Sequence, residues 1–243
     1  GKSSLCNALF QGEVTPVSDV HAGTREVRRF RLSGHGHSMV ITDLPGVGES
    51  RDRDAEYEAL YRDILPELDL VLWLIKADDR ALSVDEYFWR HILHRGHQQV
   101  LFVVTQADKT EPCHEWDMAG IKPSPAQAQN IREKTEALFR LFRPVHPVVA
   151  VSARTGWELD TLVSALMTAL PDHAASPLMT RLQDGLRTES VRSQAREQFT
   201  GAVDRIFDTA ESVCVASVVR TALRAVRDTV VSVARAVWNW IFF

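Results

Sequence analysis

The sequence predicts an α/β protein with a mostly parallel sheet and a helical extension at the C-terminus. Two unbroken apolar runs, Leu70 to Ile75 and Val100 to Val104, are typical of parallel strands that helices cover on both faces. Segments with helical periodicity separate these runs, and strand patterns vanish after about Pro177. A length of 243 residues suits one such domain plus an appendage.

The remaining elements follow in alternating order. A helix is expected to start near Leu5, and Val27 to Leu32 alternates apolar with basic residues, which indicates an edge strand with one wet face. Turn residues then lead to a second hairpin strand, residues 38–42. A third buried strand spans residues 148–151. Helices are expected at about residues 54–65, 84–93, 126–141 and 157–170.

Composition narrows the class of protein. The chain is 45% hydrophobic and 25% charged, as in soluble globular proteins. A net charge of −4 and a pI near 6.2 disfavour a protein that coats nucleic acid. Cys6, Cys113 and Cys214 show no spacing typical of a zinc site or a disulfide framework, so we expect a reducing, cytoplasmic setting.

The first candidate motif is Gly1-Lys2-Ser3-Ser4, which matches the end of a P-loop, G-x-x-x-x-G-K-[ST]. In a P-loop, backbone N–H groups and a helix N-terminus cradle phosphates, the lysine adds charge, and the hydroxyl ligates Mg²⁺. The same short string also recurs by chance as a solvated turn.

A second motif, Asp43-Leu44-Pro45-Gly46, directly follows a predicted strand. The aspartate can hold Mg²⁺ through water, and the Gly46 N–H can bind a γ-phosphate. Thr24 lies between the two motifs, where a loop hydroxyl can complete the Mg²⁺ shell when a third phosphate is present. Taken singly, these residues equally suit a strand-ending turn and a loop threonine.

Two further motifs follow buried strands. Thr105-Gln106-Ala107-Asp108 comes after the strand that ends at Val104, and its carboxylate can accept both N–H donors of guanine, a pair that adenine lacks. Ser152-Ala153 follows the next strand, where backbone N–H groups can contact guanine O6. Three of the four motifs follow strands, at the carboxyl edge where open parallel sheets bind ligands.

As a set, GKSSLCNALF at 1–10, AGTR at 22–25, DLPGVGE at 43–49, TQAD at 105–108 and SA at 152–153 resemble the Era/TrmE branch of the translation-factor-like GTPases, and most nearly its YfjP/YeeP-type bacterial members. The resemblance covers about residues 1–170. It implies a Ras-like three-layer sandwich whose first central strand is missing here, binding of GTP or GDP with Mg²⁺, and GTP hydrolysis.

By residue, the resemblance implies phosphate contact by Gly1 and Lys2, and base contact by Asp108 and Ala153. Adding the motif neighbours gives a nucleotide-binding set of Gly1, Lys2, Ser3, Ser4, Thr24, Asp43, Gly46, Thr105, Gln106, Asp108, Ser152 and Ala153. Ser3, Thr24 and Asp43 are the expected Mg²⁺ residues, and no catalytic residue is assigned.

The sequence departs from the family pattern at three places. The P-loop is incomplete and its strand absent, a loss that should cost many kcal/mol against a total stability of about 5–15 kcal/mol. We therefore expect the isolated chain to fold poorly or to bind nucleotide weakly. Thr105 and Gln106 replace the usual Asn and Lys, while Val47 stands where Ras-like enzymes carry a water-orienting glutamine. Hydrolysis should then be slow without a partner.

The domain boundaries are expected at 1–172 for the nucleotide-binding unit and 177–243 for the helical extension. Within the extension, the 213–243 segment carries an apolar stripe at gaps of three and four, arginines between, and a Trp/Phe end. It can pack or self-associate, which the narrow stripe favours, or contact a membrane surface. Arginine-free stretches are too short for a transmembrane span.

Two function classes remain open. The first is a GTP-hydrolysing switch with mobile segments near residues 20–26 and 46–56, and a ribosome-linked effector is what some relatives suggest. The second is a degenerate, non-hydrolytic relative that acts as an interaction protein through its C-terminal helices. An ATP-binding P-loop protein is disfavoured by Asp108.

Overall fold

The computed structural model describes residues 2–11, 13–22, 25–34, 37–44, 46–47, 51–93 and 99–213. Its strands form two three-stranded sheets, an antiparallel one in the order β1-β2-β3 and a parallel one in the order β4-β5-β6. The strands are β1 Glu13–Ala22, β2 Arg25–Gly34, β3 His37–Asp43, β4 Val71–Lys76, β5 Val100–Thr105 and β6 Val149–Ala150.

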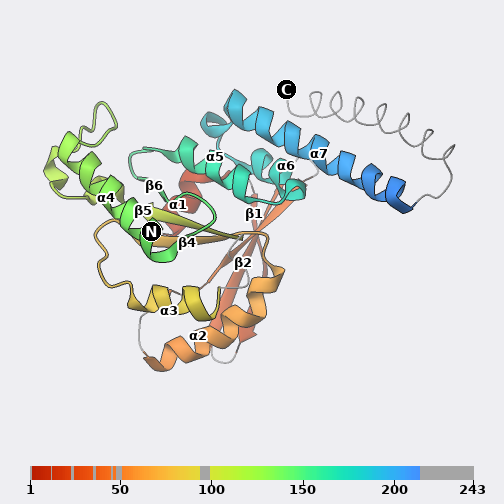
Figure 1. Ribbon diagram of the computed structural model, residues 1–243, viewed down its shortest axis with the longest axis horizontal. Coiled ribbons are helices and arrows are strands. Elements are labelled where there is room, and N and C mark those ends of the chain that lie inside the picture. The colour runs from red at the N-terminus through yellow and green to blue at the C-terminus, as the bar shows by residue number, and fades with distance from the viewer. Residues whose placement is uncertain are drawn as a thin grey trace.

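Helices cover both faces of the parallel sheet, with α2 and α3 below it and α5, α6 and α7 above it in Figure 1. The α-helices are α1 Lys2–Leu9, α2 Arg51–Ile64, α3 Ser83–His91, α4 Pro125–Phe142, α5 Leu159–Ala169, α6 Asp172–Arg181 and α7 Glu189–Val213. Short 3-10 turns are η1 Leu65–Glu67, η3 Ala107–Lys109, η4 Cys113–Glu115 and η5 Asp184–Leu186.

The parallel sheet confirms the two apolar runs as strands. All six residues of β5 are buried, because β4 and β6 pair with its two edges and a hydrophobic cluster covers each face. Leu101 and Val103 face a cluster built with α1, α5, α6 and α7. Phe102 and Val104 face a second cluster built with α2, α3 and α4, where Trp73 and Trp89 are also buried.

The antiparallel sheet corrects one expectation. The segment predicted as an edge strand is β2, which lies between β1 and β3 and pairs with both. The edge strand β1 has no clear strand pattern because it contains Pro16, and its register shifts between Pro16 and Ser18. Residues 20–22 of the first expected switch segment belong to β1.

The break between the two sheets falls where a central strand is expected to be missing. Within the described residues, β3 pairs with β2 and β4 pairs with β5, and no ladder joins β3 to β4. Asp43 ends β3 beside this break.

The C-terminal helices hold the antiparallel sheet and the end of α1. The Arg181 guanidinium is buried and its Nη1 donates to the Ser33 carbonyl of β2 at 2.8 Å. The Gln183 N–H donates to the Leu9 carbonyl at 2.8 Å, and the Gln11 N–H donates to the Arg181 carbonyl at 2.8 Å. In the described part of the chain, no helix is long and apolar enough to cross a membrane.

A partly buried hydrogen bond between β4 and α3 provides a test of this packing. Trp73 Nε1 donates to Asp85 Oδ1 at 2.8 Å. Asp85→Ala should lower the free energy of unfolding by about 1–3 kcal/mol because it leaves a buried indole N–H unpaired. Asp85→Asn keeps the acceptor and should lose less, as measured by urea unfolding.

The charge at this position adds a pH dependence. Burial raises the pKa of the Asp85 carboxyl above its usual 3.8. As pH falls through that raised pKa toward 3.8, wild type should gain stability relative to Asp85→Asn, since the folded state binds the proton more tightly. Glu86→Gln, which removes a neighbouring charge of the same helix turn, is the control. An Asn variant as unstable as the Ala variant would contradict the assignment.

Candidate functional site

The predicted motifs lie at the carboxyl ends of the strands. Asp43 ends β3, the 105–108 motif begins at the last residue of β5, and Ser152 follows two residues after β6. In an open α/β sheet this edge is where ligands bind. The described motif residues form two groups, one around Asp108 and one around Asp43.

The Asp108 group is a buried polar cluster. The Asp108 carboxylate accepts a hydrogen bond from Ser152 Oγ at 2.6 Å, and a second from Arg154 Nε at 2.8 Å. Its side chain is only 2% exposed, whereas that of Arg154 is 62% exposed. Two residues that were predicted separately, Asp108 and Ser152, are therefore in contact, together with an arginine that the sequence motif did not include.

Backbone hydrogen bonds hold the two loops of this cluster against each other. Gln106 adopts a left-handed conformation with φ 59° and starts the 3-10 turn that carries Asp108. The Ala107 N–H donates to the Val151 carbonyl at 3.1 Å. The Ser152 and Gly156 N–H groups close the 152–157 loop onto the carbonyls of Trp157 and Ser152, at 3.1 and 2.9 Å. Ala153 sits within this closed turn.

The start of α4 holds the C-terminal end of the 105–110 loop, which carries Asp108. Ser124 and Gln127 form a reciprocal capping box at the helix N-terminus. The buried Gln127 amide also donates to the Thr110 carbonyl at 2.9 Å. The 105–110 loop is thereby tied to β6 on one side and to α4 on the other, which makes the position of Asp108 rigid.

The Asp43 group brings two other motifs together. Lys2 begins α1, and its Nζ lies 3.6 Å from Asp43 Oδ1. Ser3 and Ser4 are exposed in the first turn of the same helix. Gly1 and Thr24, two further predicted site residues, lie outside the described residues.

The chemistry of this group fits Mg²⁺. Hydroxyl and carboxylate oxygens are the donors that Mg²⁺ prefers, and Ser3 and Asp43 supply one of each. The Lys2 ammonium already places a positive charge beside the Asp43 carboxylate. Burial, followed by the negative charge of Asp43, raises the pKa of the Cys6 thiol on the same helix.

The Gly46 and Val47 positions differ in their surroundings. A Cβ at Gly46 would meet nothing within 4 Å, so packing does not require glycine there. Val47 instead is partly buried and packs against the hydrophobic cluster that lies between the parallel sheet and helices α2 and α3. The side chain at the position of the water-orienting glutamine is thus turned inward.

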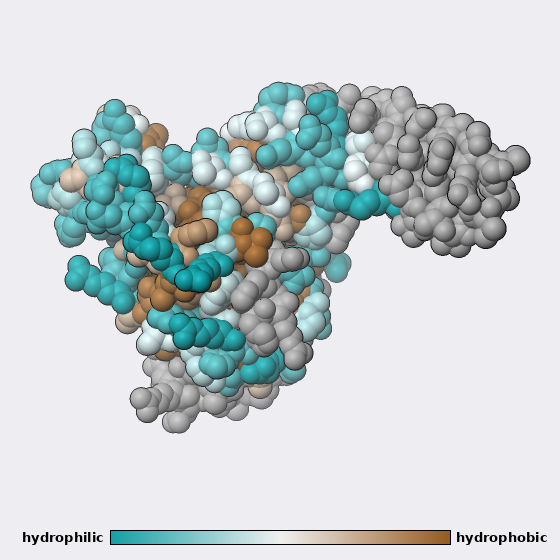
Figure 2. Space-filling model, viewed as in Figure 1, coloured by the Kyte–Doolittle hydropathy of each residue, from teal (hydrophilic) through white to brown (hydrophobic). Residues whose placement is uncertain are grey.

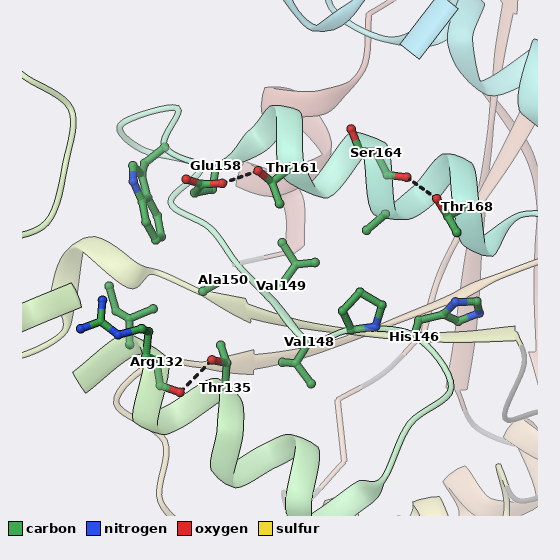
Figure 3. A pocket seen from close by; sticks show the side chains of 14 residues that line it. Arg132, Thr135, His146, Val148, Val149, Ala150, Glu158, Thr161, Ser164 and Thr168 are labelled. Atoms are coloured by element: carbon green, nitrogen blue, oxygen red, sulfur yellow. Dashed lines mark hydrogen bonds between the residues drawn. The ribbon is translucent and has the colours of Figure 1, made fainter. Parts of the chain in front are cut away.

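A separate cavity of about 500 Å³ lies between α4 and α5, along the outer edge of β6 (Figure 3). Figure 2 shows hydrophobic side chains in a hollow on this face. Several of its polar side chains bond within their own helices: Thr135 to Arg132, Thr161 to Glu158, and Thr168 to Ser164. None of the predicted site residues lines it, and its lining offers no constellation for catalysis.

The fold and the two polar groups together define a P-loop nucleotide-binding protein. Residues 1–106 match the family described as 50S ribosome-binding GTPase. YeeP of Escherichia coli K12 is 96% identical over 183 residues, which cover 75% of this chain and 78% of YeeP. YfjP of the same organism is 52% identical over 244 residues, covering 100% of this chain and 84% of YfjP.

A solved structure of Era in complex with MgGDPNP and part of 16S ribosomal RNA has the same fold, with a TM-score of 0.50 at 22% identity. The match covers 70% of this chain and 53% of the Era chain, so this chain spans about half the length of Era. The chain belongs to the Era-like P-loop GTPases, in the family that includes YeeP and YfjP.

The proximity of Asp43 to Cys6 can be tested by alkylation. Because Asp43 contributes to the raised pKa of the Cys6 thiol, Asp43→Asn should increase the fraction of reactive thiolate. We expect iodoacetamide to modify Cys6 about twofold to threefold faster in the variant near pH 8, since burial remains. Peptide mass spectrometry measures the rate, with the exposed Cys113 as internal reference. An unchanged ratio of the two rates would contradict the arrangement.

Proposed function

We propose that this protein binds GTP and GDP with Mg²⁺ and hydrolyses GTP as a molecular switch. The observation that carries the proposal is the Asp108 carboxylate, held at the carboxyl end of β5 next to the 152–157 loop. Membership of a GTPase family supports the same conclusion.

Guanine selection follows from the chemistry of a buried carboxylate. A carboxylate is an acceptor, and guanine offers N1–H and 2-amino N–H donors on one edge. Adenine would leave Asp108 facing a ring nitrogen lone pair, and an unpaired buried charge is strongly unfavourable. Thr105 and Gln106 complete the base loop, while Ser152 orients Asp108 and the Ala153 N–H serves the base oxygen.

The phosphates would lie at the start of α1. The helix N-terminus favours negative charge, and Lys2 and Ser4 lie in the first turn of α1, so we assign phosphate contact to them and to the preceding Gly1. Ser3, Thr24 and Asp43 would hold Mg²⁺, which adds positive charge at the phosphates. The Lys2 to Asp43 contact supports this assignment because both residues belong to one charge-balanced group.

Hydrolysis is proposed to be slow without assistance. Val47 packs into the core and carries no group that could orient water. A partner, a second copy or an ion would supply the missing stabilisation of charge. The switch would act through the segments near residues 20–26 and 46–56, with Thr24 and Gly46 responding to the third phosphate.

The cellular setting is proposed from the relatives and the sequence. A ribosome-linked effector is suggested by Era, whose solved complex contains 16S ribosomal RNA. We assign residues 1–172 to nucleotide binding and 177–243 to an extension. Residues 214–243 lie outside the described residues, and for the 213–243 segment we propose a role in self-association or packing. A cytoplasmic protein, peripheral to the membrane if that segment instead binds lipid, fits this role.

Titration with fluorescently labelled GDP tests the proposal. We would use this chain, and the same chain extended upstream by a strand and a complete G-x-x-x-x-G-K-S loop. Mg²⁺-dependent binding with GTP competing far better than ATP is expected, tighter in the extended chain. Asp108→Asn should weaken GDP binding about tenfold to a hundredfold, through loss of charged hydrogen bonds.

Two variants serve as controls. Asp63→Asn, exposed on α2, should leave the affinity unchanged. Gly46→Ala should fold normally, because its added Cβ would meet nothing within 4 Å. It should weaken the binding of GTP more than that of GDP, because Gly46 is proposed to respond to the third phosphate. If both chains are folded and neither binds guanine nucleotide, the switch is wrong and the C-terminal helices become the candidate site of function.

A further inference from the structure

Arg154 is hydrogen-bonded to the Asp108 carboxylate with which a guanine base would pair. Arg154 Nε donates to Asp108 Oδ2 at 2.8 Å, while Ser152 Oγ takes the other carboxylate oxygen. With both oxygens engaged, the Asp108 side chain is 2% exposed. Each oxygen keeps a second lone pair, but this burial leaves a base no access to it while Arg154 stays in place.

The group that covers Asp108 has the donor pattern of guanine itself. A guanidinium is a planar N–C–N unit that presents N–H donors and no acceptor. The N1–C2–N2 edge of guanine presents two N–H donors on the same kind of unit. At the corresponding edge, adenine presents a lone pair and a C–H.

We propose that Arg154 is an internal substitute for the guanine base: it pairs with Asp108 in the empty protein and competes with the incoming base for that carboxylate. The inference rests on the proposed function and names a residue that sets nucleotide affinity and selectivity. It applies to the base half of the site, all of which lies within the described residues.

The structure indicates that Arg154, rather than Asp108, is the residue that moves. Asp108 lies in a turn that is tied to β6 through the Ala107 N–H and to α4 through Thr110. The Arg154 side chain is 62% exposed, and its Nη2 lies 3.9 Å from the sulfur of Met118 in an exposed loop. Its release moves a charge into water, where a guanidinium is well solvated.

The pair has two consequences for binding. It keeps a buried carboxylate partnered when the site is empty, which avoids the penalty of an isolated buried charge. It also lowers guanine affinity, because one charged hydrogen bond must break before another forms. Adenine has no donor pair to exchange for Arg154 and leaves the pair intact, so the pair lowers guanine affinity without changing adenine affinity and narrows the difference between the two.

The test is Arg154→Ala, examined in the full chain and in the upstream-extended chain. Removal of the competitor should lower the Kd for GDP about threefold to tenfold, mainly through faster association, given the strength of a half-exposed charged hydrogen bond. The Kd for ADP, measured by competition, should not change. Arg140→Ala is the matched control, since it removes another mostly exposed arginine, one that pairs with Glu136 on α4.

Ionic strength supplies a second readout. Salt screens the Arg154 to Asp108 pair, so the ratio of wild-type to Arg154→Ala Kd for GDP should approach one as salt rises. A loss of phosphate contacts alone would leave that ratio constant.

The outcomes separate this inference from the proposed function. If wild type binds GDP and Arg154→Ala binds it equally well or more weakly, Arg154 is no competitor and the inference is overturned while the function stands. If wild type, Arg140→Ala and Arg154→Ala all fail to bind guanine nucleotide, with and without the upstream extension, the inference and the proposed function are both overturned.

Discussion

Strand β5 is the structural constraint on which the rest of the molecule depends. Both of its edges are paired and both of its faces are covered, so the two main hydrophobic clusters meet on its six residues. Helices from opposite layers are held at fixed positions relative to this strand. The loop at the carboxyl end of β5 carries Asp108 and is held in place by the same packing. A site on such an edge is positioned by the core rather than by its own loop contacts.

The burial of polar groups at that edge explains the chemistry of the site. Asp108 and Ser152 lie among apolar residues, where a hydrogen bond left unmade is expensive. The carboxylate is therefore partnered in every state the protein can hold stably. An arginine from the adjoining loop fills that role in the structure, and a base with matching donors can replace it. Affinity for a ligand is then the difference between two partners, which links selectivity to a residue that need not touch the ligand.

The start of α1, where we propose that phosphates bind, is connected through this helix to the C-terminal helices. The first turn of α1 carries Lys2 beside Asp43, and the last turn of α1 is bonded to the 181–183 segment. The same segment reaches β2 through Arg181, whose burial lowers the pKa of its guanidinium. A shift of β2 and β3 relative to α1 would therefore also change the positions of α6 and α7. The extension is built onto the strands on which a nucleotide switch would act.

The sequence by itself predicted the buried strands β4 and β5 and the helices α2 to α5 to within about three residues, and it named Asp108, Ser152, Lys2 and Asp43 as members of one candidate site. Hydrophobic periodicity and motif order are local properties that a sequence carries directly. Only the tertiary structure decided that β2 is central, that Glu13–Ala22 is a strand, and that Arg154 covers Asp108. Strand pairing and the partner of a buried charge depend on which distant residues meet in space, and no local pattern specifies that.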